Sequence, residues 1–305
     1  MAPSKRRISR AAIFFALLSA VLAVLLYRST RPAAPIPVPA RAARTQATPA
    51  PRVPVSRRTA PVARTAPALP RAPDDAKSGA ARSQGPATIA ILIDDLGNDR
   101  AAVDHIASWP YPVSAAVLPA LAGSGESARQ LERSGKEVLL HLPMEPRGFP
   151  GVRPGPGVVL RAQSDAEIAA ILDSDLDSVP GAVGVNNHMG SAATADARVM
   201  RVVSGVLARR GLFFVDSRTT DTTVARDAAR AAKVPTASRR VFLDDVATEA
   251  AVESSLAGLF ARAREEGSAI AIGHPHPATL AVLDRELPKL AQHGVRLVKV
   301  SELVQ

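Results

Sequence analysis

The sequence predicts an α/β fold, a distorted (β/α) barrel of about seven strands, beginning near Ala87. Two observations predict it. From that residue onward, short apolar runs rich in β-branched residues alternate with longer helical patterns, and this order is typical of a parallel sheet with helical crossovers. The runs are apolar throughout, as in strands that are buried on both faces. A doubly wound open sheet is the alternative.

The individual elements follow from local patterns. Residue Ser164, with Glu167 three positions later, forms a capping-box sequence at a helix start, and Gly135 ends the helix before it. The expected strands are 88–93, 113–117, 137–141, 182–185, 212–215, 240–243, 269–272 and 295–300. The expected helices are 98–108, 124–133, one beginning after Ser164, 196–210, 223–232, 248–266 and 279–293.

Residues 1–30 are expected to be a membrane anchor. Basic residues at positions 5, 6, 7 and 10 precede the uncharged run Ala11–Tyr27, which as a helix spans about 25 Å of a hydrocarbon core about 30 Å thick. Positive charge before such a run keeps the N-terminus in the cytoplasm. We therefore expect a single-pass protein of the inner membrane with its folded domain in the periplasm. A cleaved signal peptide is the alternative.

Residues 31–86 are expected to be a disordered linker. They consist mainly of Ala, Pro, Arg, Thr and Ser, and such a segment buries too little apolar surface to offset the entropy of ordering it. Residues 1–86 together hold 13 of the 26 prolines. The folded domain is then 87–305.

The charge distribution excludes nucleic acid as the expected partner. The chain carries a net charge of +10. Residues 1–86 hold 15 Lys and Arg against 2 Asp and Glu, whereas the rest holds 23 against 26. The basic character therefore belongs to the N-terminal segment and not to the folded surface where phosphate contacts are made. The chain has no cysteine, which excludes disulfides, thiolate metal ligands and cysteine nucleophiles.

Polar residues lie after six of the expected strands, where a parallel barrel carries its active site. A carboxylate and two imidazoles from separate strands make a site for zinc or a similar divalent ion. A further carboxylate beside them can act as a general base, which predicts metal-assisted hydrolysis. The residues in question are Asp94, Asp95, His141, Asn186, Asn187, His188, Asp216, Arg218, Asp244, Asp245, His274 and His276.

Several segments together resemble the divergent polysaccharide deacetylase family. They are ILIDDLGND, SGKEVLLHLPMEP, AVGVNNHMGS, FFVDSRTT, RRVFLDD and AIAIGHPHPATL, and they extend over nearly all of residues 88–300. The family is distantly related to metal-dependent carbohydrate esterases, which remove acetyl groups from glycans and have a distorted (β/α) barrel. The resemblance therefore implies an acetylated polysaccharide as substrate and a divalent metal, expected to be zinc, as cofactor.

The resemblance also implies roles for individual residues. Asp94 resembles the catalytic base and Asp95 the metal-binding carboxylate next to it. His141 resembles the first histidine of a His-x-x-x-His ligand pair, and His274 the histidine that protonates the leaving group. The nearby His276 is a second candidate for that proton donor.

One position departs from the pattern of the wider group. Glu145 stands four residues after His141, where the second histidine is expected. His188 is the preferred replacement as a metal ligand, and Glu145 is the other candidate. The Arg-Pro-Pro-Tyr segment of the wider group is also absent, and Asn187-His188 takes its place in the order.

The predicted function is carbohydrate deacetylation by a metal-dependent hydrolase. Two alternatives stay open: a non-catalytic glycan- or protein-binding protein that retains the barrel, and a hydrolase of another ester or amide. The residues expected to bind the substrate are Asn187, Asp216, Arg218, Asp244 and Asp245.

Overall fold

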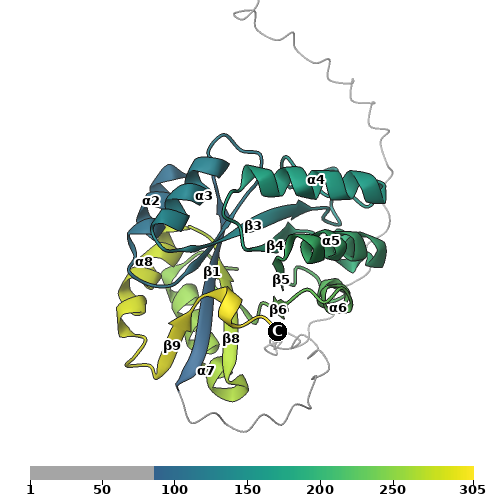
Figure 1. Cartoon of the computed structure of the whole chain (residues 1–305). Helices are drawn as coiled ribbons and strands as arrows, with labels where there is room; N and C mark the ends of the chain where they lie inside the picture. Colours follow the sequence, from purple (N-terminus) through teal and green to yellow (C-terminus); the bar gives the residue numbers. More distant parts are fainter. Residues whose placement is uncertain (1–85) are drawn as a thin grey trace, which may run out of the picture. The chain divides into compact units, whose positions relative to one another are not determined.

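A computed structural model describes residues 86–305 (Figure 1). The strands are β1 (Ala87–Leu96), β2 (Ser114–Val117), β3 (Glu137–Met144), β4 (Gly184–Met189), β5 (Phe213–Asp216), β6 (Thr236–Ser238), β7 (Val241–Phe242), β8 (Ser268–Gly273) and β9 (Val295–Val298). The α-helices are α2 (Arg100–Ser108), α3 (Ser124–Arg133), α4 (Asp165–Ser178), α5 (Ala197–Arg210), α6 (Ala225–Ala231), α7 (Glu249–Glu266) and α8 (Pro277–Glu286).

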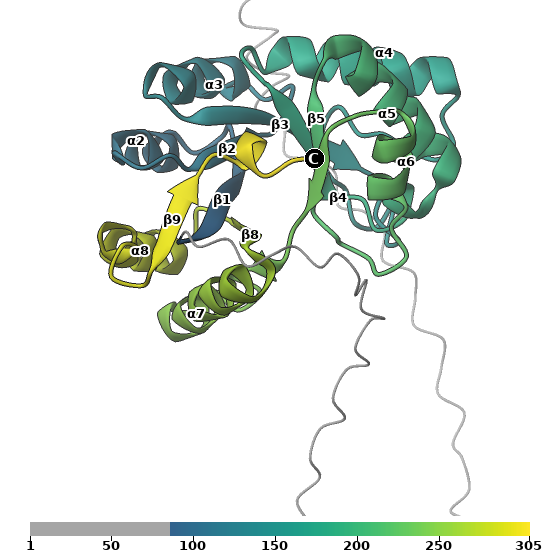
Figure 2. The ribbon, with the colours of Figure 1, turned by 60° about the horizontal axis from the view of Figure 1, so that its bottom comes forward.

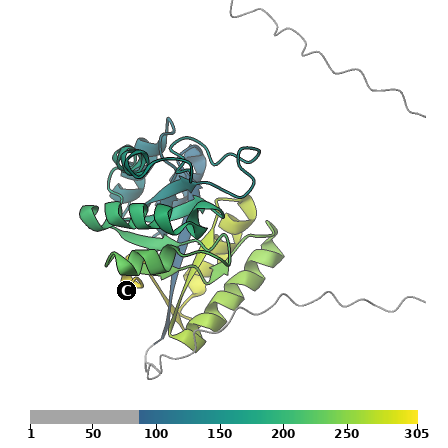
Figure 3. The ribbon, with the colours of Figure 1, turned by 90° about the vertical axis from the view of Figure 1, so that its right-hand side faces the viewer.

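The strands form one strongly curled parallel sheet with the order β6-β5-β4-β3-β2-β1-β8-β7. Every strand pairing in residues 86–305 is parallel. The helices lie around the outside of the strands in Figures 1 and 2, and the long helix α7 runs along one flank in Figure 3. This is the predicted distorted (β/α) barrel, and the open doubly wound alternative is excluded.

One extended segment, 236–242, joins the two ends of the sheet. It contains β6, which pairs with β5, and β7, which pairs with β8. Between them the amide of Arg239 donates to Asp216 O (3.0 Å) and the amide of Arg240 donates to Ile270 O (2.8 Å). The single strand predicted at 240–243 is therefore wrong in its bounds, because its pairing changes partner at residues 239 and 240.

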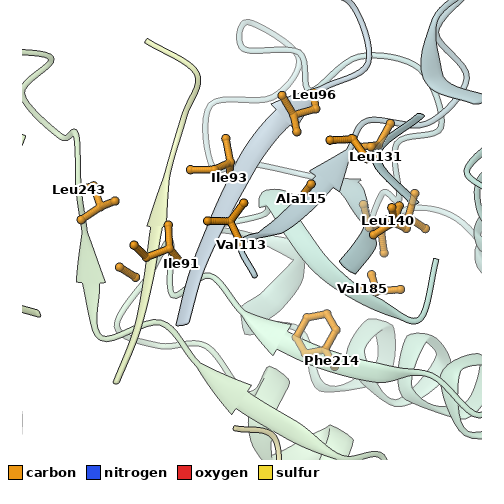
Figure 4. Packing of buried hydrophobic residues seen from close by; sticks show 14 of the residues in the cluster. Ile91, Ile93, Leu96, Val113, Ala115, Leu131, Leu140, Val185, Phe214 and Leu243 are labelled. Carbon is orange, nitrogen blue, oxygen red and sulfur yellow. The ribbon is translucent and has the colours of Figure 1, made fainter. Parts of the chain in front are cut away.

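Alternation along the strands produces two apolar cores. Odd-numbered residues of β1, such as Ile91 and Ile93, face the helices and belong to the outer core (Figure 4). Even-numbered residues, such as Ala90 and Leu92, face the barrel interior with Leu139 of β3. These side chains fill the middle of the barrel interior, and the polar side chains of His141 and Asn186 lie beyond them toward the carboxyl ends of the strands.

The amino end of the barrel is closed by the C-terminal segment. Strand β9 pairs with the first half of β1, and Val298, Val300 and Leu303 pack into the interior core. The backbone of Gln305 exchanges two hydrogen bonds with Thr236 of β6 (2.9 and 3.2 Å). The C-terminal segment therefore covers the interior core at this end of the barrel.

Other predicted elements differ from the structure mainly at their ends. The capping box at Ser164 and Glu167 is confirmed. The helix predicted at 279–293 ends at Glu286 and continues as the short 3₁₀ turn Leu287–Lys289. Pro288 explains this, since it cannot donate the next helical hydrogen bond.

The predicted anchor (1–30) and linker (31–86) lie outside the described residues, except for Pro86. Within the part of the chain that the structure describes, no helix has the length and apolar character to cross a membrane.

Candidate metal centre and active site

Strand alternation brings four polar side chains to the mouth of the barrel. On β1, Asp94 lies two residues after the inward-facing Leu92, and on β3 His141 lies two residues after Leu139. Asn186 and His188 are two residues apart on β4 and therefore share a face. The structure extends β3 and β4 beyond their predicted ends. His141 therefore lies inside its strand rather than at its last residue, and Asn186 and His188 lie within β4 rather than after it.

Asp95 reaches the same site only because the backbone departs from regular strand geometry. A regular strand would point it outward, opposite to Asp94. The pairing of β1 with β2 shifts register between Ile93 and Leu96, and Asp95 has a φ of +58°. This left-handed conformation is unfavourable for most residues, but Asp tolerates it better than most non-glycine residues do. It directs two consecutive carboxylates to one site.

Asp95, His141 and His188 form a compact cluster. Oδ1 of Asp95 lies 3.2 Å from Nε2 of His141 and 3.0 Å from Nδ1 of His188, and these two ring nitrogens are 3.2 Å apart. Although it is buried, Asp95 Oδ1 has no partner with hydrogen-bond geometry within residues 86–305. Three possible ligand atoms thus converge on one point, and of these only the two ring nitrogens have hydrogen-bond geometry with each other.

This donor set fits a divalent metal. Ligand atoms at about 2.0–2.1 Å from a tetrahedral zinc ion lie about 3.3 Å apart, which is close to the three separations above. One carboxylate with two imidazoles is also a donor set that zinc uses at catalytic sites. These three residues are therefore a candidate metal site, and the name metal cluster refers to these three side chains.

The charges within the cluster shift several pKa values. Burial raises the pKa of Asp95, but the adjacent nitrogens of His141 and His188 outweigh burial and hold that pKa well below its usual range. Burial also raises the pKa of Asp94, and in this case burial prevails over the nearby His141 and His274. For His141, burial lowers the pKa, but the carboxylates of Asp94 and Asp95 raise it above the ordinary value.

Asn186 connects Asp94 to the metal cluster. Its Nδ2 donates to both carboxylate oxygens of Asp94 (2.9 and 3.0 Å) and approaches Ser217 Oγ at 3.2 Å. Its Oδ1 lies 2.9 Å from Nδ1 of His141. Asn186 is fully buried, so these contacts are made without competition from water.

A second polar pair lies opposite, after β7 and β8. Nδ1 of His274 is 3.0 Å from Oδ1 of Asp244, whose Oδ2 accepts from the amide of His274 and from the hydroxyl of Thr279. Burial lowers the pKa of His274, but its hydrogen bond with Asp244 and the charges on the site carboxylates raise it to about 9. Nε2 of His274 lies 3.9 Å from Oδ2 of Asp95, so a protonated imidazole faces the metal cluster.

Aromatic stacking holds His274 from the side. The Phe242 ring stacks on the imidazole with 5.3 Å between centroids and 16° between planes. The guanidinium of Arg239 lies 4.4 Å from the centroid of the same ring. On the outer side, the exposed His276 lies 5.7 Å from His274 at a tilt of 38°. With Asp244 and His274, it also forms a group of possible metal ligands.

The remaining predicted substrate-binding residues are less central. Asn187 is buried, accepts from the amide of Ser217 and donates to Met189 O, so it anchors loops. Asp216 is also buried and accepts from the amide of Arg218 and the hydroxyl of Thr223. Arg218 is half-buried in the loop after β5, and the exposed Asp245 follows β7.

Glu145 does not join the metal cluster. Its carboxylate accepts from the backbone amide of Arg161 (2.7 Å) and from the guanidinium of the same residue (2.8 and 3.0 Å). It therefore fastens the loop that follows β3, and of the two candidates considered for the missing second histidine, His188 is the one that lies in the cluster.

Three contributors to the site were not predicted from the sequence: Asn186 as a bridge, Phe242 as a stacking partner and Arg239 beside it. Two of them lie two residues from a predicted site residue, and residues at this spacing in a strand share a face. Asn186 is two residues before His188, and Phe242 is two residues before Asp244. The position of Arg239 depends on the change of pairing partner between β6 and β7, which has no counterpart in the hydrophobic pattern.

The fold is a curled parallel (β/α) barrel with polar residues gathered at its mouth. Over residues 91–304 the chain matches the family described as divergent polysaccharide deacetylase, and it belongs to that family.

Particular relatives agree with this assignment. The chain is 41% identical over 217 residues to the uncharacterized protein YibQ of Escherichia coli strain K12, covering 71% of this chain and 67% of that protein. It is 36% identical over 215 residues to an uncharacterized protein of Haemophilus influenzae, covering 70% and 76%. Among solved structures, the uncharacterized protein ATU2773 from Agrobacterium tumefaciens C58 is 26% identical with a TM-score of 0.69, covering 74% of this chain and 91% of that one.

Proposed function

We propose that the protein is a zinc-dependent hydrolase that removes acetyl groups from an envelope polysaccharide. The observation that carries the proposal is the convergence of Asp95, His141 and His188 on one point, with Asp94 beside them and the Asp244–His274 pair opposite. Membership of the divergent polysaccharide deacetylase family supports the substrate class.

Asp95, His141 and His188 are the residues that would hold the metal. Once bound, a divalent cation polarises the acetyl carbonyl and makes water a stronger nucleophile at neutral pH. The site's own charge favours this cation, because the carboxylates of Asp94 and Asp95 lie together at the mouth of the barrel, next to its interior apolar core.

The two flanking groups supply the proton transfers. Asp94 accepts a proton from the attacking water, whose oxygen forms a bond to the acetyl carbon. The bond from that carbon to the sugar nitrogen or oxygen then breaks, and His274 donates its proton to the departing atom. Asp244 orients this imidazole and stabilises its protonated form. The products are acetate and a free amine or hydroxyl.

The location of the protein is part of the same proposal. The sequence of residues 1–30 supports an inner-membrane anchor with the barrel in the periplasm. A barrel tethered there by residues 31–86 would meet acetylated glycans of the envelope.

The decisive experiment measures zinc content and acetate release together, with N-acetylated glycans as substrates. We expect stoichiometric zinc and acetate release in the native chain, and loss of both in His141→Ala. Asp94→Asn should keep the zinc and lose about 10²–10⁴ in rate, which is the usual contribution of a general base. His105→Ala is the matched control, because His105 lies on α2 and bonds Asp284 away from the site.

Each other outcome has a definite meaning. Wild-type turnover in Asp94→Asn would remove its role as base. Full zinc occupancy without acetate release from any glycan would favour the non-catalytic binding protein. A native chain that binds no divalent metal would refute the site.

A further inference from the structure

We infer that Asn186 is a positioning residue that fixes which nitrogen of His141 is available to the metal and at the same time orients the base Asp94. This inference rests on the proposed function. It concerns a single buried amide that contacts both the metal cluster and the proton acceptor.

The orientation of the amide follows from hydrogen-bond chemistry. As the base of the proposed function Asp94 is ionised, and an ionised carboxylate only accepts hydrogen bonds. Both of its oxygens lie within 3.0 Å of the same Asn186 nitrogen. That atom must therefore be the NH₂ group. The oxygen of the amide then faces Nδ1 of His141 at 2.9 Å.

This orientation determines the state of His141. An amide oxygen has no proton to give, so Nδ1 of His141 must carry the hydrogen of the 2.9 Å contact. In a neutral imidazole the other nitrogen then has the lone pair. That nitrogen, Nε2, is the atom that faces Asp95 and His188. Asn186 thus prepares His141 for ligation through Nε2.

The same amide links ligation to catalysis. Asp94 lies 3.5 Å from Nε2 of His141, so a free carboxylate could rotate toward the histidine and compete for its proton. The two hydrogen bonds from Asn186 hold both carboxylate oxygens and restrict that rotation. A partner that orients a metal-bound histidine typically contributes 10–100-fold in metal affinity.

Two substitutions of nearly equal size separate these effects. Asn186→Asp keeps an acceptor for His141 but replaces the NH₂ group with a second carboxyl oxygen, which shares a proton with Asp94 and so removes it as a free base. Asn186→Leu removes both. Ser217→Ala is the matched control, because it removes only the third contact of the amide, at 3.2 Å.

The measurement uses the 1–305 chain with ¹⁵N-labelled histidine, studied by NMR, and zinc titration by calorimetry. In the native chain, at a pH where His141 is neutral, we expect its proton on Nδ1. Asn186→Leu should lose this preference and weaken zinc binding about 10–100-fold. Asn186→Asp should keep the preference and bind zinc within about 3-fold of the native chain, but lose turnover. Ser217→Ala should match the native chain in both measurements.

Failure of the inference is distinct from failure of the proposed function. A proton on Nε2 of His141 in the native chain, or unchanged zinc affinity in Asn186→Leu, would overturn the role of Asn186 even in an active enzyme. The histidine spectrum of the native chain tests the inference without any substitution, so this test stays valid even if a variant does not fold. Absence of zinc binding in the native chain would overturn the proposed function, while the spectrum still tests Asn186.

Discussion

At the residue scale, the site depends on side chains that hold one another in a single protonation state. His274 illustrates this, since Asp244 fixes one nitrogen and Phe242 packs against the ring face. A protonated imidazole is attracted to the negative face of an aromatic ring, as is the guanidinium of Arg239 on the same ring. In the proposed function, Phe242 therefore both orients the proton donor His274 and stabilises its charge.

Replacing Phe242 with leucine should therefore slow turnover. An interaction of this kind contributes about 0.5–1 kcal/mol, which corresponds to a decrease of about 2–5-fold in kcat. Zinc affinity should stay unchanged, because Phe242 stacks on His274 and not on a residue of the metal cluster. Steady-state kinetics of acetate release measure the effect.

Phe260→Leu is the control for this prediction. Phe260 stacks on His293 at 5.0 Å, in a pair formed by α7 and the segment before β9. The substitution Phe260→Leu removes a comparable ring contact outside the site and should leave kcat unchanged. Equal kcat values for Phe242→Leu and the native chain would show that the stack does not support catalysis.

At the scale of single elements, helix α4 carries a buried acid that makes it sensitive to pH. Asp175 is 2% exposed, and its Oδ2 has no hydrogen-bond partner among residues 86–305. The loop before the helix accommodates it with a glycine: a Cβ on Gly157 would lie 2.2 Å from Oδ1 of Asp175, and the φ of this glycine is +71°. Burial raises the pKa of Asp175 to about 8.

This shift predicts that the domain loses stability as the pH rises. Between about pH 4 and pH 8 the folded chain keeps the Asp175 proton while the unfolded chain has released it. The free energy of unfolding should therefore fall by up to about 1.4 kcal/mol per pH unit across this window and level off above it. Urea unfolding at several pH values measures the slope.

Asp175→Asn isolates the contribution of this carboxyl from those of other titrating groups. Asparagine has nearly the same size and does not titrate, so the variant should show a shallower slope and gain stability over the native chain at pH 8. Parallel slopes for the two proteins would contradict the assignment.

The elements also show how far the sequence alone could lead. Asp94, Asp95, His141 and His274 were identified because they lie near the carboxyl ends of apolar runs. Which side chains of β4 point into the barrel was not predictable. The expected strand 182–185 ended before the polar residues, so the alternation of side chains along a strand could not be applied to them. Asn187, which is expected to bind substrate, contacts Ser217 and Met189 in the structure, and the bridging role of Asn186 follows only once β4 is known to extend to Met189.

At the scale of the whole molecule, the fold was predictable and its closure was not. A series of buried strands alternating with helices is enough to predict a parallel barrel. The joining segment 236–242 and the closing segment after β9 depend on contacts between residues far apart in sequence, such as Thr236 with Gln305. Local patterns contain no information on such contacts.

The C-terminal segment should stabilise the barrel without affecting the site at its other end. Val300 is fully buried in the interior core. Its backbone amide donates to Ser114 Oγ (3.0 Å), and an alanine at this position keeps that hydrogen bond. Val300→Ala should lower the free energy of unfolding by about 2 kcal/mol through lost burial and a residual cavity. Zinc affinity should not change.

Urea unfolding and zinc titration test this separation together. Val183→Ala is the control, since Val183 is 46% exposed and its truncation should cost less than about 0.5 kcal/mol. Loss of zinc affinity in Val300→Ala would mean that the two ends of the barrel are coupled.

The segment 236–242 also limits how the protein can meet a partner. An open parallel sheet has two unpaired edges, and either can recruit an extended peptide as an additional strand. Here the same segment bonds β5 on one side and both Gln305 and β8 on the other. With β6 and β7 joined in this way, these two strands offer little free backbone for strand addition, so recognition of a long polymer there would depend on side chains at the mouth of the barrel.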